Sequence, residues 1–297
     1  SSAIGADARK AEQALRVISD AANREFYWPA SWPDAMPWKR RKREALQTLK
    51  ALVDRHLQAR LPQAGASAAA PESADLLGRL LQLHHADPQV WPLHAVRDEC
   101  MTAFLAGHET VAATLTWWAH CMATHPEAQA AVADEVAQQL QGRPPTAADL
   151  PGLPGLTRSL QETMRLYPAA PVLLSRRATR PINLGPWQFP ARTLFMVPVQ
   201  LMQTDARWFA DPLAFRPERF APGAPEVPRG AWLPFGTGPR VCLGQHLAMA
   251  EMTVAAALLL QGWRLSSVQG EAAPQAALRV TLRPAEPLHL RLDPRRP

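Results

Sequence analysis

The sequence predicts a mainly α-helical fold with small β-sheets. Apolar residues recur every three or four positions up to Pro171, which is the helical period, whereas alternating apolar and polar residues first appear after it. The chain has 297 residues, of which 47% are hydrophobic and 20% charged. This composition supplies a large buried core and excludes a disordered protein.

Composition also limits the setting in which the protein works. Three cysteines (Cys100, Cys121 and Cys242) give no even disulfide framework, so we expect a reducing compartment, the cytoplasm. No apolar run reaches membrane-spanning length and no secretory signal opens the chain, so we expect no transmembrane anchor. The net charge of +6 permits an acidic partner without identifying one, and the 30 prolines, with many Ala and Arg residues, favour a GC-rich bacterial source.

The first elements are helices. The periodicity predicts a helix over residues 7–25, a Trp- and Pro-rich turn over 28–37, and a second helix to about residue 60. Residues 62–73 are expected to be a loop of low complexity, followed by a short helix from Asp75.

The second helix begins with a basic run, Lys39-Arg40-Arg41-Lys42-Arg43. Such a run could contact nucleic acid or a membrane surface, or it could be a solvated helix face. No further basic cluster flanks it. We therefore favour the solvated face and expect no nucleic-acid partner.

A long helix is predicted over residues 93–123, nearly all apolar and so expected to cross the centre of the molecule. Small residues share one of its faces at spacings of three and four: Ala103, Ala106, Gly107, Thr110 and Thr114. This stripe either packs closely on another helix or leaves room for a large flat ligand. Gly107 weakens the helix, which is tolerable where a ligand approaches the backbone. Glu109 places a carboxylate in an apolar segment, where an unpaired charge is costly unless it reaches solvent.

Strands are expected in the last part of the chain. The alternating segments are residues 172–178, 182–197 with a break at Gly185-Pro186, 278–283 and 288–292. The last two segments are predicted to pair as a hairpin through residues 284–287.

The most informative segment is Pro-Phe-Gly-Thr-Gly-Pro-Arg-Val-Cys-Leu-Gly, residues 234–244. Its glycines and prolines predict an irregular loop, and a helix follows from Leu243. A helix N-terminus favours a thiolate at Cys242, and the loop with Arg240 suits a thiolate ligand to a metal-centred cofactor. The alternatives are a buried structural cysteine, or a pair with His246 acting as half a metal site or a nucleophile–base dyad. No second Cys or His lies at zinc spacing.

The pattern Phe-Gly-x-Gly-x-Arg-x-Cys-x-Gly resembles the haem-binding loop of the cytochrome P450 family, the haem-thiolate monooxygenases. The resemblance implies that Cys242 is the axial iron ligand, that Arg240 binds a haem propionate, and that Phe235 packs against the thiolate side. It also assigns the loop glycines to cofactor binding: Gly236, Gly238 and Gly244.

The sequence Ala-Gly-His-Glu-Thr in the long helix resembles the oxygen-side motif of the same family. The resemblance implies that Glu109 and Thr110 are the acid–alcohol pair that manages protons, with Ala106 and Gly107 against the cofactor. Many members have a second Thr where this chain has Val111.

Two further motifs follow in the family's order. Glu-x-x-Arg is by itself a common surface ion pair, but here a downstream Pro-Glu-Arg-Phe accompanies it. The resemblance implies a buried structural network of Glu162, Arg165 and Arg219. Arg176 is either a second propionate-binding arginine or a surface strand residue. Gln203 and Thr204 depart from the residues that the family frequently has there, which leaves one haem-side contact unassigned.

Together the motifs cover residues 101–250, and the resemblance implies a single cytochrome P450 domain over residues 1–297 that lacks the family's N-terminal sheet and early helices. It implies haem b (iron protoporphyrin IX), an apolar small-molecule substrate that receives one oxygen atom of O2, and electrons from a ferredoxin or flavoprotein reductase. The alternatives are a truncated, non-catalytic haem-binding or scaffold remnant, and a peroxide-driven haem enzyme.

Overall fold

The computed structural model describes residues 7–26, 28, 32–64, 75–172, 174–270 and 272–295. Most of the predicted low-complexity loop lies outside these residues. The chain groups into two compact units, one up to His108 and one from Glu109. The two units are described separately, and the single domain over the whole chain stays a prediction.

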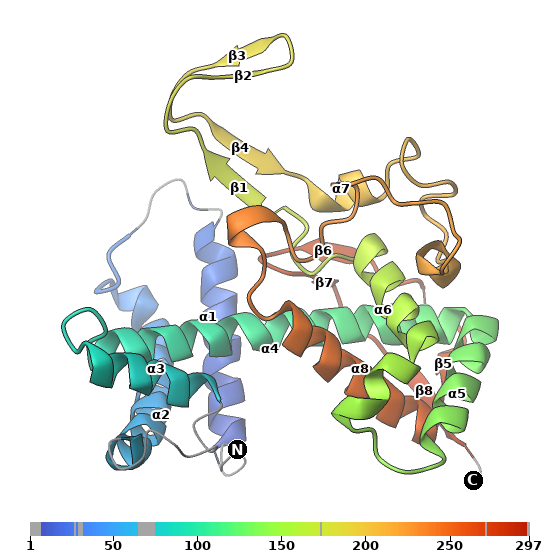
Figure 1. Cartoon of the computed structure of the whole chain (residues 1–297), viewed down its shortest axis with the longest axis horizontal. Coiled ribbons are helices and arrows are strands. Elements are labelled where there is room, and N and C mark those ends of the chain that lie inside the picture. Colours follow the sequence, from blue (N-terminus) through green and yellow to red (C-terminus); the bar gives the residue numbers. More distant parts are fainter. Residues whose placement is uncertain are drawn as a thin grey trace. The chain divides into compact units, whose positions relative to one another are not determined.

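The first unit is helical (Figure 1). It contains α1 (Ala8–Phe26), the 3₁₀ turn η1 (Pro37–Lys39), α2 (Arg40–Ala64), α3 (Leu76–Ala86) and the first half of α4 (Leu93–Thr124). The predicted helices are thus confirmed, and α3 begins directly after Asp75, where a short helix was expected. The side chain of Asp75 accepts a hydrogen bond of 2.8 Å from the amide of Gly78, which satisfies one otherwise unpaired donor at the helix start.

The apolar faces of these helices form two small cores. In one, α1 packs on α2 and α4 through buried side chains that include Leu15, Ile18, Leu49 and Met101. In the other, α2, α3 and α4 meet around Leu57, Leu81 and Val96, among others. Full burial of one such side chain stabilises the fold by about 1.5–3 kcal/mol relative to an exposed one.

The basic run at the start of α2 is paired locally. Lys39 is buried and donates to the Trp32 carbonyl at 2.6 Å, and it forms ion pairs with Glu25 at 3.3 Å and Asp34 at 3.2 Å. Lys42 pairs with the same two carboxylates. The solvated-face interpretation is therefore wrong for Lys39, which is buried, and holds for Arg40 and Arg41, which are exposed.

In the residues that the structure describes, the second unit combines helices with four two-stranded sheets. Its helices are the rest of α4, α5 (Pro126–Leu140), η3 (Ala147–Gly152), α6 (Pro154–Leu166), α7 (Val199–Gln203), η4 (Pro217–Phe220), η5 (Gly238–Arg240) and α8 (Gln245–Gly262). One core unites α4, α5, α6 and α8, and its fully buried side chains include Trp118, Leu156, Leu160, Met252 and Leu260. The helix predicted from Leu243 begins two residues later, after Gly244 at its N-cap.

Every strand pair that the structure describes is antiparallel. They are β1 (Leu174–Arg177) with β4 (Leu194–Val197), β2 (Ile182–Leu184) with β3 (Trp187–Phe189), β5 (Trp263–Ser267) with β8 (Leu290–Pro294), and β6 (Ala276–Leu278) with β7 (Leu282–Pro284). The break predicted at Gly185 is the turn between β2 and β3, where a φ of 57° favours glycine. Figure 1 shows this hairpin extending from β1 and β4.

The predicted C-terminal hairpin is wrong in its pairing. Residues 278–283 do not pair with 288–292. Instead the chain turns at Arg279, whose amide donates to the Thr281 carbonyl at 3.2 Å, and β6 pairs with β7. Strand β8 pairs with β5, which follows α8 directly. Both pairings satisfy the same alternation of apolar and polar residues, so the local pattern could not distinguish them.

Candidate functional site

The loop before α8 is folded back on itself by backbone hydrogen bonds. The amide of Cys242 donates to the carbonyl of Phe235 at 2.9 Å, and the amide of Gly236 donates to the carbonyl of Leu233 at 3.1 Å. Gly236 and Gly238 have φ values of 72° and 73°, a backbone conformation that side-chain-bearing residues rarely adopt. The two glycines therefore allow the loop to present Cys242 immediately before the helix.

The three cysteines lie in different surroundings. Cys242 is exposed, Cys100 is half-buried and Cys121 is buried. Burial raises the pKa of the Cys121 thiol to about 12, which keeps it protonated and unreactive. Because Cys242 is exposed, the interpretation of this residue as a buried structural cysteine is wrong.

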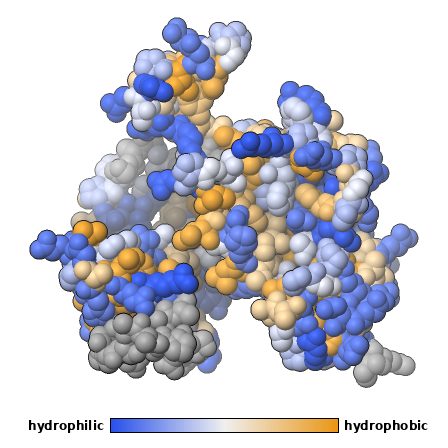
Figure 2. All heavy atoms as spheres, viewed as in Figure 1, coloured by the Kyte–Doolittle hydropathy of each residue, from blue (hydrophilic) through white to orange (hydrophobic). Residues whose placement is uncertain are grey.

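Apolar side chains are exposed beside Cys242. Leu243 is 94% exposed and Leu247 is 71% exposed, and Figure 2 shows hydrophobic residues gathered over the start of α8. Such exposed leucines are typical of a surface that another group covers. His246 is exposed and its ring lies 3.3 Å from the side-chain amide of Gln245. Within the described residues, no group of three or more His, Cys, Asp or Glu side chains is arranged to hold a metal ion.

The two predicted propionate-binding arginines are accessible. Arg240 is exposed in η5, and Arg176 is exposed on β1, where its guanidinium donates to the carbonyl of Ser175 at 2.9 Å. In the described part of the chain, neither guanidinium is paired with a carboxylate. Both groups are therefore able to bind an anion.

These residues fit a haem. The donor set is chemically suitable, because Cys242 offers one exposed thiol sulfur and exposed leucines and an arginine lie next to it. Space is also available, since a Cβ added at Gly238 would meet no atom within 4 Å, and one added at Gly244 would lie 4.0 Å from the sulfur of Cys242. The Phe235 ring packs partly against the core of this unit, so the loop has a fixed base.

The small-residue stripe of α4 is open along part of its length. Ala103, Ala106 and Gly107 are exposed, and a Cβ added at Gly107 would meet nothing within 4 Å. From Val111 onward the helix enters the core of the second unit. The prediction that α4 is a central buried helix therefore holds for its second half and not for residues 102–108.

The predicted acid–alcohol pair lies where the exposed part of α4 passes into the buried part. Thr110 and Glu109 are half-buried, and the carbonyl of Thr110 accepts a hydrogen bond of 3.0 Å from the hydroxyl of Thr114. The carboxylate of Glu109 accepts a hydrogen bond of 2.6 Å from the hydroxyl of Thr281. No local pattern predicts this contact, because the two residues are 172 positions apart.

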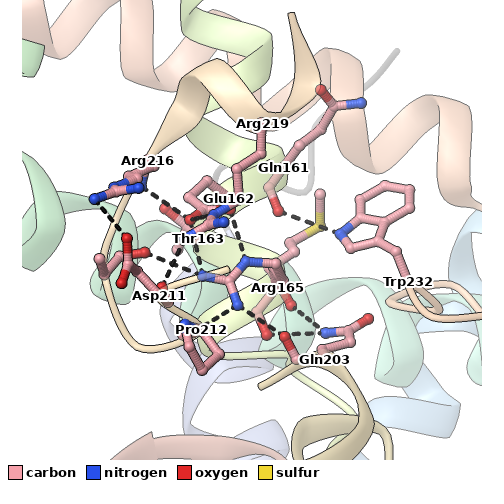
Figure 3. A network of polar contacts seen from close by, with 12 residues as sticks. Gln161, Glu162, Thr163, Arg165, Gln203, Asp211, Pro212, Arg216, Arg219 and Trp232 are labelled. Atoms are coloured by element: carbon pink, nitrogen blue, oxygen red, sulfur yellow. Dashed lines mark hydrogen bonds and ion pairs between the residues drawn. The ribbon is translucent and has the colours of Figure 1, made fainter. Parts of the chain in front are cut away.

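The three charged residues predicted to form a network lie together (Figure 3). Arg165 and Glu162 are both 0% exposed and are joined by two hydrogen bonds of 2.8 Å, and Arg219 donates to Glu162 at 3.1 Å. The same carboxylate accepts from the amide of Arg216 at 2.9 Å. One buried carboxylate thus binds two guanidinium groups and one backbone amide.

Backbone carbonyls complete this network. Arg165 also donates to the carbonyls of Gln203 and Pro212, both at 2.7 Å, and of Ala214 at 3.1 Å (Figure 3). Arg219 donates to the carbonyl of Asp211 at 2.6 Å. The network therefore fixes the irregular segment between α7 and η4 against α6, a structural role.

Gln203 is the main residue whose role the sequence did not predict. Its buried side-chain amide donates to the carbonyls of Met164 and Arg165 at 2.9 and 3.0 Å, and it accepts from the amide of Leu233 at 2.7 Å. Leu233 directly precedes the loop that carries Cys242 and accepts a hydrogen bond from Gly236 within it. Gln203 therefore connects the end of α6 to the base of that loop. The local sequence does not single it out, because the same short apolar segment also contains Gln200.

The first unit contains a cavity of about 640 Å³. Its lining is mostly apolar and includes Leu49, Leu52, Val53, Leu77 and Phe104. The size and lining are typical of pockets that bind small apolar molecules.

Comparison with known proteins agrees with the motifs. A family model described as cytochrome P450 matches residues 6–291. The chain belongs to the cytochrome P450 family. Among curated relatives, a protein of Streptomyces melanosporofaciens named cyclooctat-9-en-7-ol 5-monooxygenase is 34% identical over 266 residues, which is 88% of this chain and 56% of that protein. A cytochrome P450 of Mycobacterium tuberculosis strain H37Rv is 37% identical over 218 residues, 73% of this chain and 46% of that protein.

Solved structures show the cytochrome P450 fold. A zebrafish cytochrome P450 in a structure with abiraterone has a TM-score of 0.79 and 27% identity, with 97% of this chain and 65% of that chain covered. The haem domain of cytochrome P450DA has a TM-score of 0.80 at 24% identity, covering 97% and 60% of the two chains. The chain spans about half to two thirds of the length of these relatives. None of the helices that the structure describes has the length and apolar character needed to cross a membrane.

Proposed function

We propose that this chain is the haem-ligating part of a monooxygenase. The observation that carries the proposal is the exposed thiol of Cys242, held in a loop that matches the family's cysteine motif, with exposed apolar side chains and Arg240 beside it. The reaction inserts one oxygen atom of O2 into a C–H bond or double bond of an apolar organic molecule. Two electrons and two protons reduce the other atom to water.

The cofactor in this proposal is haem b. Cys242 ligates the iron through its thiolate, Arg240 and Arg176 bind the propionates, and Phe235 supports the loop from the core. The remaining contacts are backbone or small-residue contacts: Gly236, Gly238, Gly244, Ala106 and Gly107. Thiolate-ligated haem supplies the activation of dioxygen.

Two residues of α4 are assigned the proton transfer in this proposal. Thr110 is proposed to hold a proton or a water molecule at its hydroxyl, and Glu109, which precedes it, to exchange protons with that position. Both residues are half-buried, so the site is partly shielded from bulk water. The contact between Glu109 and Thr281 supports a fixed orientation of the carboxylate.

The partners and the compartment follow from the same proposal. Electrons are supplied by a ferredoxin or a flavoprotein reductase, as expected for this family. The three free cysteines support a reducing environment, which we propose to be the cytoplasm. The substrate class is apolar, which the names of relatives such as cyclooctat-9-en-7-ol 5-monooxygenase support.

The test uses dioxygen labelled with heavy oxygen. The chain, loaded with haem and supplied with electrons by a surrogate ferredoxin and its reductase, is incubated with a panel of apolar terpenoid and fatty-acid substrates. We expect one labelled oxygen atom in the product and none in a matched Cys242→Ser reaction. Product formed only with hydrogen peroxide would establish the peroxide-driven alternative. Absence of product with either oxidant would establish a non-catalytic remnant.

A further inference from the structure

We propose that Thr281 and Arg283 are positioning residues that hold the carboxylate of Glu109 in the direction required for proton delivery. The inference rests on the proposed monooxygenase function and deepens it. All three residues belong to the second unit of the chain. Neither Thr281 nor Arg283 lies in a motif that the sequence singles out.

The contacts converge on one oxygen atom. The hydroxyl of Thr281 donates to Oε1 of Glu109 at 2.6 Å, and Nη1 of Arg283 lies 3.8 Å from the same atom. Thr281 is only 3% exposed, whereas the side chains of Glu109 and Arg283 are 19% and 30% exposed. A buried hydroxyl with a charged acceptor makes a short and directional bond. The direction of the carboxylate is therefore set by the turn between β6 and β7 (residues 279–281) as well as by α4.

The turn that carries Thr281 is itself firmly attached. The indole nitrogen of Trp117 donates to the carbonyl of Leu282 at 3.0 Å, and the amide of Leu282 donates to the carbonyl of Ala169 at 3.1 Å. Trp117 is 0% exposed and stacks on Tyr167, with ring centroids 4.0 Å apart and planes 4° apart. Leu282 is buried as well. These bonds leave little freedom for the neighbouring hydroxyl.

The two attachments lie about two turns apart along α4. Glu109 and Trp117 are eight positions apart (117 minus 109), a little over two helical turns, so their side chains project about 80° apart around the helix axis. The side chain of Thr281 bonds to Glu109, and the backbone carbonyl of the next residue, Leu282, bonds to Trp117. Residues 281 and 282 thus contact α4 at points about two helical turns apart.

This arrangement has a consequence for proton delivery. Because Oε1 of Glu109 accepts from Thr281, this bond sets the orientation of the carboxylate and so the direction in which it exchanges a proton with the next residue, Thr110. Loss of the Thr281 hydroxyl would let the carboxylate swing. Because small displacements of a positioned group are costly in catalysis, electrons should then be diverted from product to hydrogen peroxide.

The experiment compares variants that keep or remove each donor. Thr281→Val keeps the volume and removes the hydroxyl, whereas Thr281→Ser keeps the hydroxyl. Arg283→Gln removes the charge and Arg283→Lys keeps it. Arg279→Gln, an exposed arginine in the same turn, is the matched control. In the haem-loaded chain with O2 and a surrogate electron donor, we expect several-fold more hydrogen peroxide per electron in Thr281→Val, a smaller rise in Arg283→Gln, and near-normal ratios in the conservative variants and the control.

A second measurement does not depend on turnover. Amide hydrogen exchange of residues 279–283 in the haem-free chain should accelerate in Thr281→Val and in Glu109→Gln but not in Thr281→Ser. Equal peroxide ratios and equal exchange in the Val and Ser variants would overturn the proposal. Faster exchange without a change in the peroxide ratio would overturn the positioning role and leave a structural contact. If the wild-type chain makes no product from O2, the proposed function fails first, and the exchange data alone report whether the contact exists.

Discussion

Arg165 shows how completely a single buried charge is satisfied in this fold. Every nitrogen of its guanidinium donates a hydrogen bond, either to Glu162 or to a backbone carbonyl. Its guanidinium also lies 5.0 Å from the ring centroid of Phe209. A buried ion pair with complete hydrogen bonding is costly to break, because removal of one partner leaves an uncompensated charge.

Glu162→Gln tests this role. The substitution keeps the shape but leaves Arg165 and Arg219 without their common carboxylate, so we expect the free energy of unfolding to fall by about 3–5 kcal/mol. Urea denaturation followed by far-UV circular dichroism measures the change. Glu12→Gln, which breaks the exposed ion pair with Arg16 (2.9 Å), is the control and should cost less than about 1 kcal/mol. Similar losses in the two variants would show that the network contributes no more than a surface pair.

The cysteines provide a second test at this scale. In the haem-free chain, a thiol-alkylating reagent at mildly alkaline pH should modify Cys242 first, because its thiol is exposed, and Cys121 last, because burial raises its pKa to about 12. Mass spectrometry of the digested chain gives the order. Loading with haem should then protect Cys242. Modification of Cys242 at an unchanged rate after loading would argue against ligation by this thiol.

At the scale of elements, the sequence predicted most of what local periodicity can encode. The helices α1, α2, α3 and α4 and the turn at Gly185 were correctly placed, because amphipathic spacing and glycine turns are local signals. The pairing of β8 with β5 was not, since alternation alone does not choose a partner strand. The Glu-x-x-Arg motif predicted Arg165, but its carbonyl partners lie 38 to 49 positions away and carry no side-chain signature.

Gln203 tests how the elements are joined at the base of the cysteine loop. Gln203→Leu keeps the bulk but leaves the carbonyls of Met164 and Arg165 and the amide of Leu233 without this partner. Each buried polar group left unpaired costs about 1–3 kcal/mol, so unfolding should occur at a clearly lower urea concentration. The amide of Gly236 should also exchange faster. Gln200→Leu, on the same short helix, is the control, and equal effects of the two substitutions would contradict the assignment.

The 3₁₀ helix η3 makes the stability of the fold depend on pH. Thr146 is the N-cap of this helix, and Asp149 in its first turn completes the capping box. Asp149 accepts from Arg143 at 2.7 and 2.5 Å and from Thr146 at 2.6 and 2.8 Å, and these bonds, the Arg143 pair first, hold the pKa of Asp149 well below its usual range. A lowered folded-state pKa contributes stability that is present above the unfolded value of about 4 and is lost as the pH falls through the folded-state pKa.

Asp149→Asn should remove that contribution. We expect the urea midpoint of the variant to lie below that of the wild type at neutral pH, and the difference to shrink as the pH falls below about 4. Parallel titrations of the two chains measure it. A difference that stays constant down to strongly acidic pH would show that the pKa of Asp149 is the same in the folded and unfolded states.

At the scale of the whole molecule, the family is established and the chemistry is proposed. The cytochrome P450 model covers residues 6–291, yet the chain spans 46% and 56% of the two bacterial relatives described above. Sequence motifs predicted which residues belong to the candidate site because the cysteine loop and the helix motif are each contiguous. The contact between Thr281 and Glu109 joins segments that are 172 positions apart, so no contiguous motif predicts it.

Ligation of haem iron by Cys242 is tested most directly by the absorption spectrum of the reduced, haem-loaded chain under carbon monoxide. Thiolate ligation by Cys242 predicts a strongly red-shifted band in the wild type. In Cys242→Ser, whose hydroxyl is a poor iron ligand of similar volume, the band should be absent while the far-UV circular dichroism remains unchanged. A red-shifted band that persists in Cys242→Ser, or that is missing from a wild-type chain with bound haem, would contradict the assignment of Cys242 as the iron ligand.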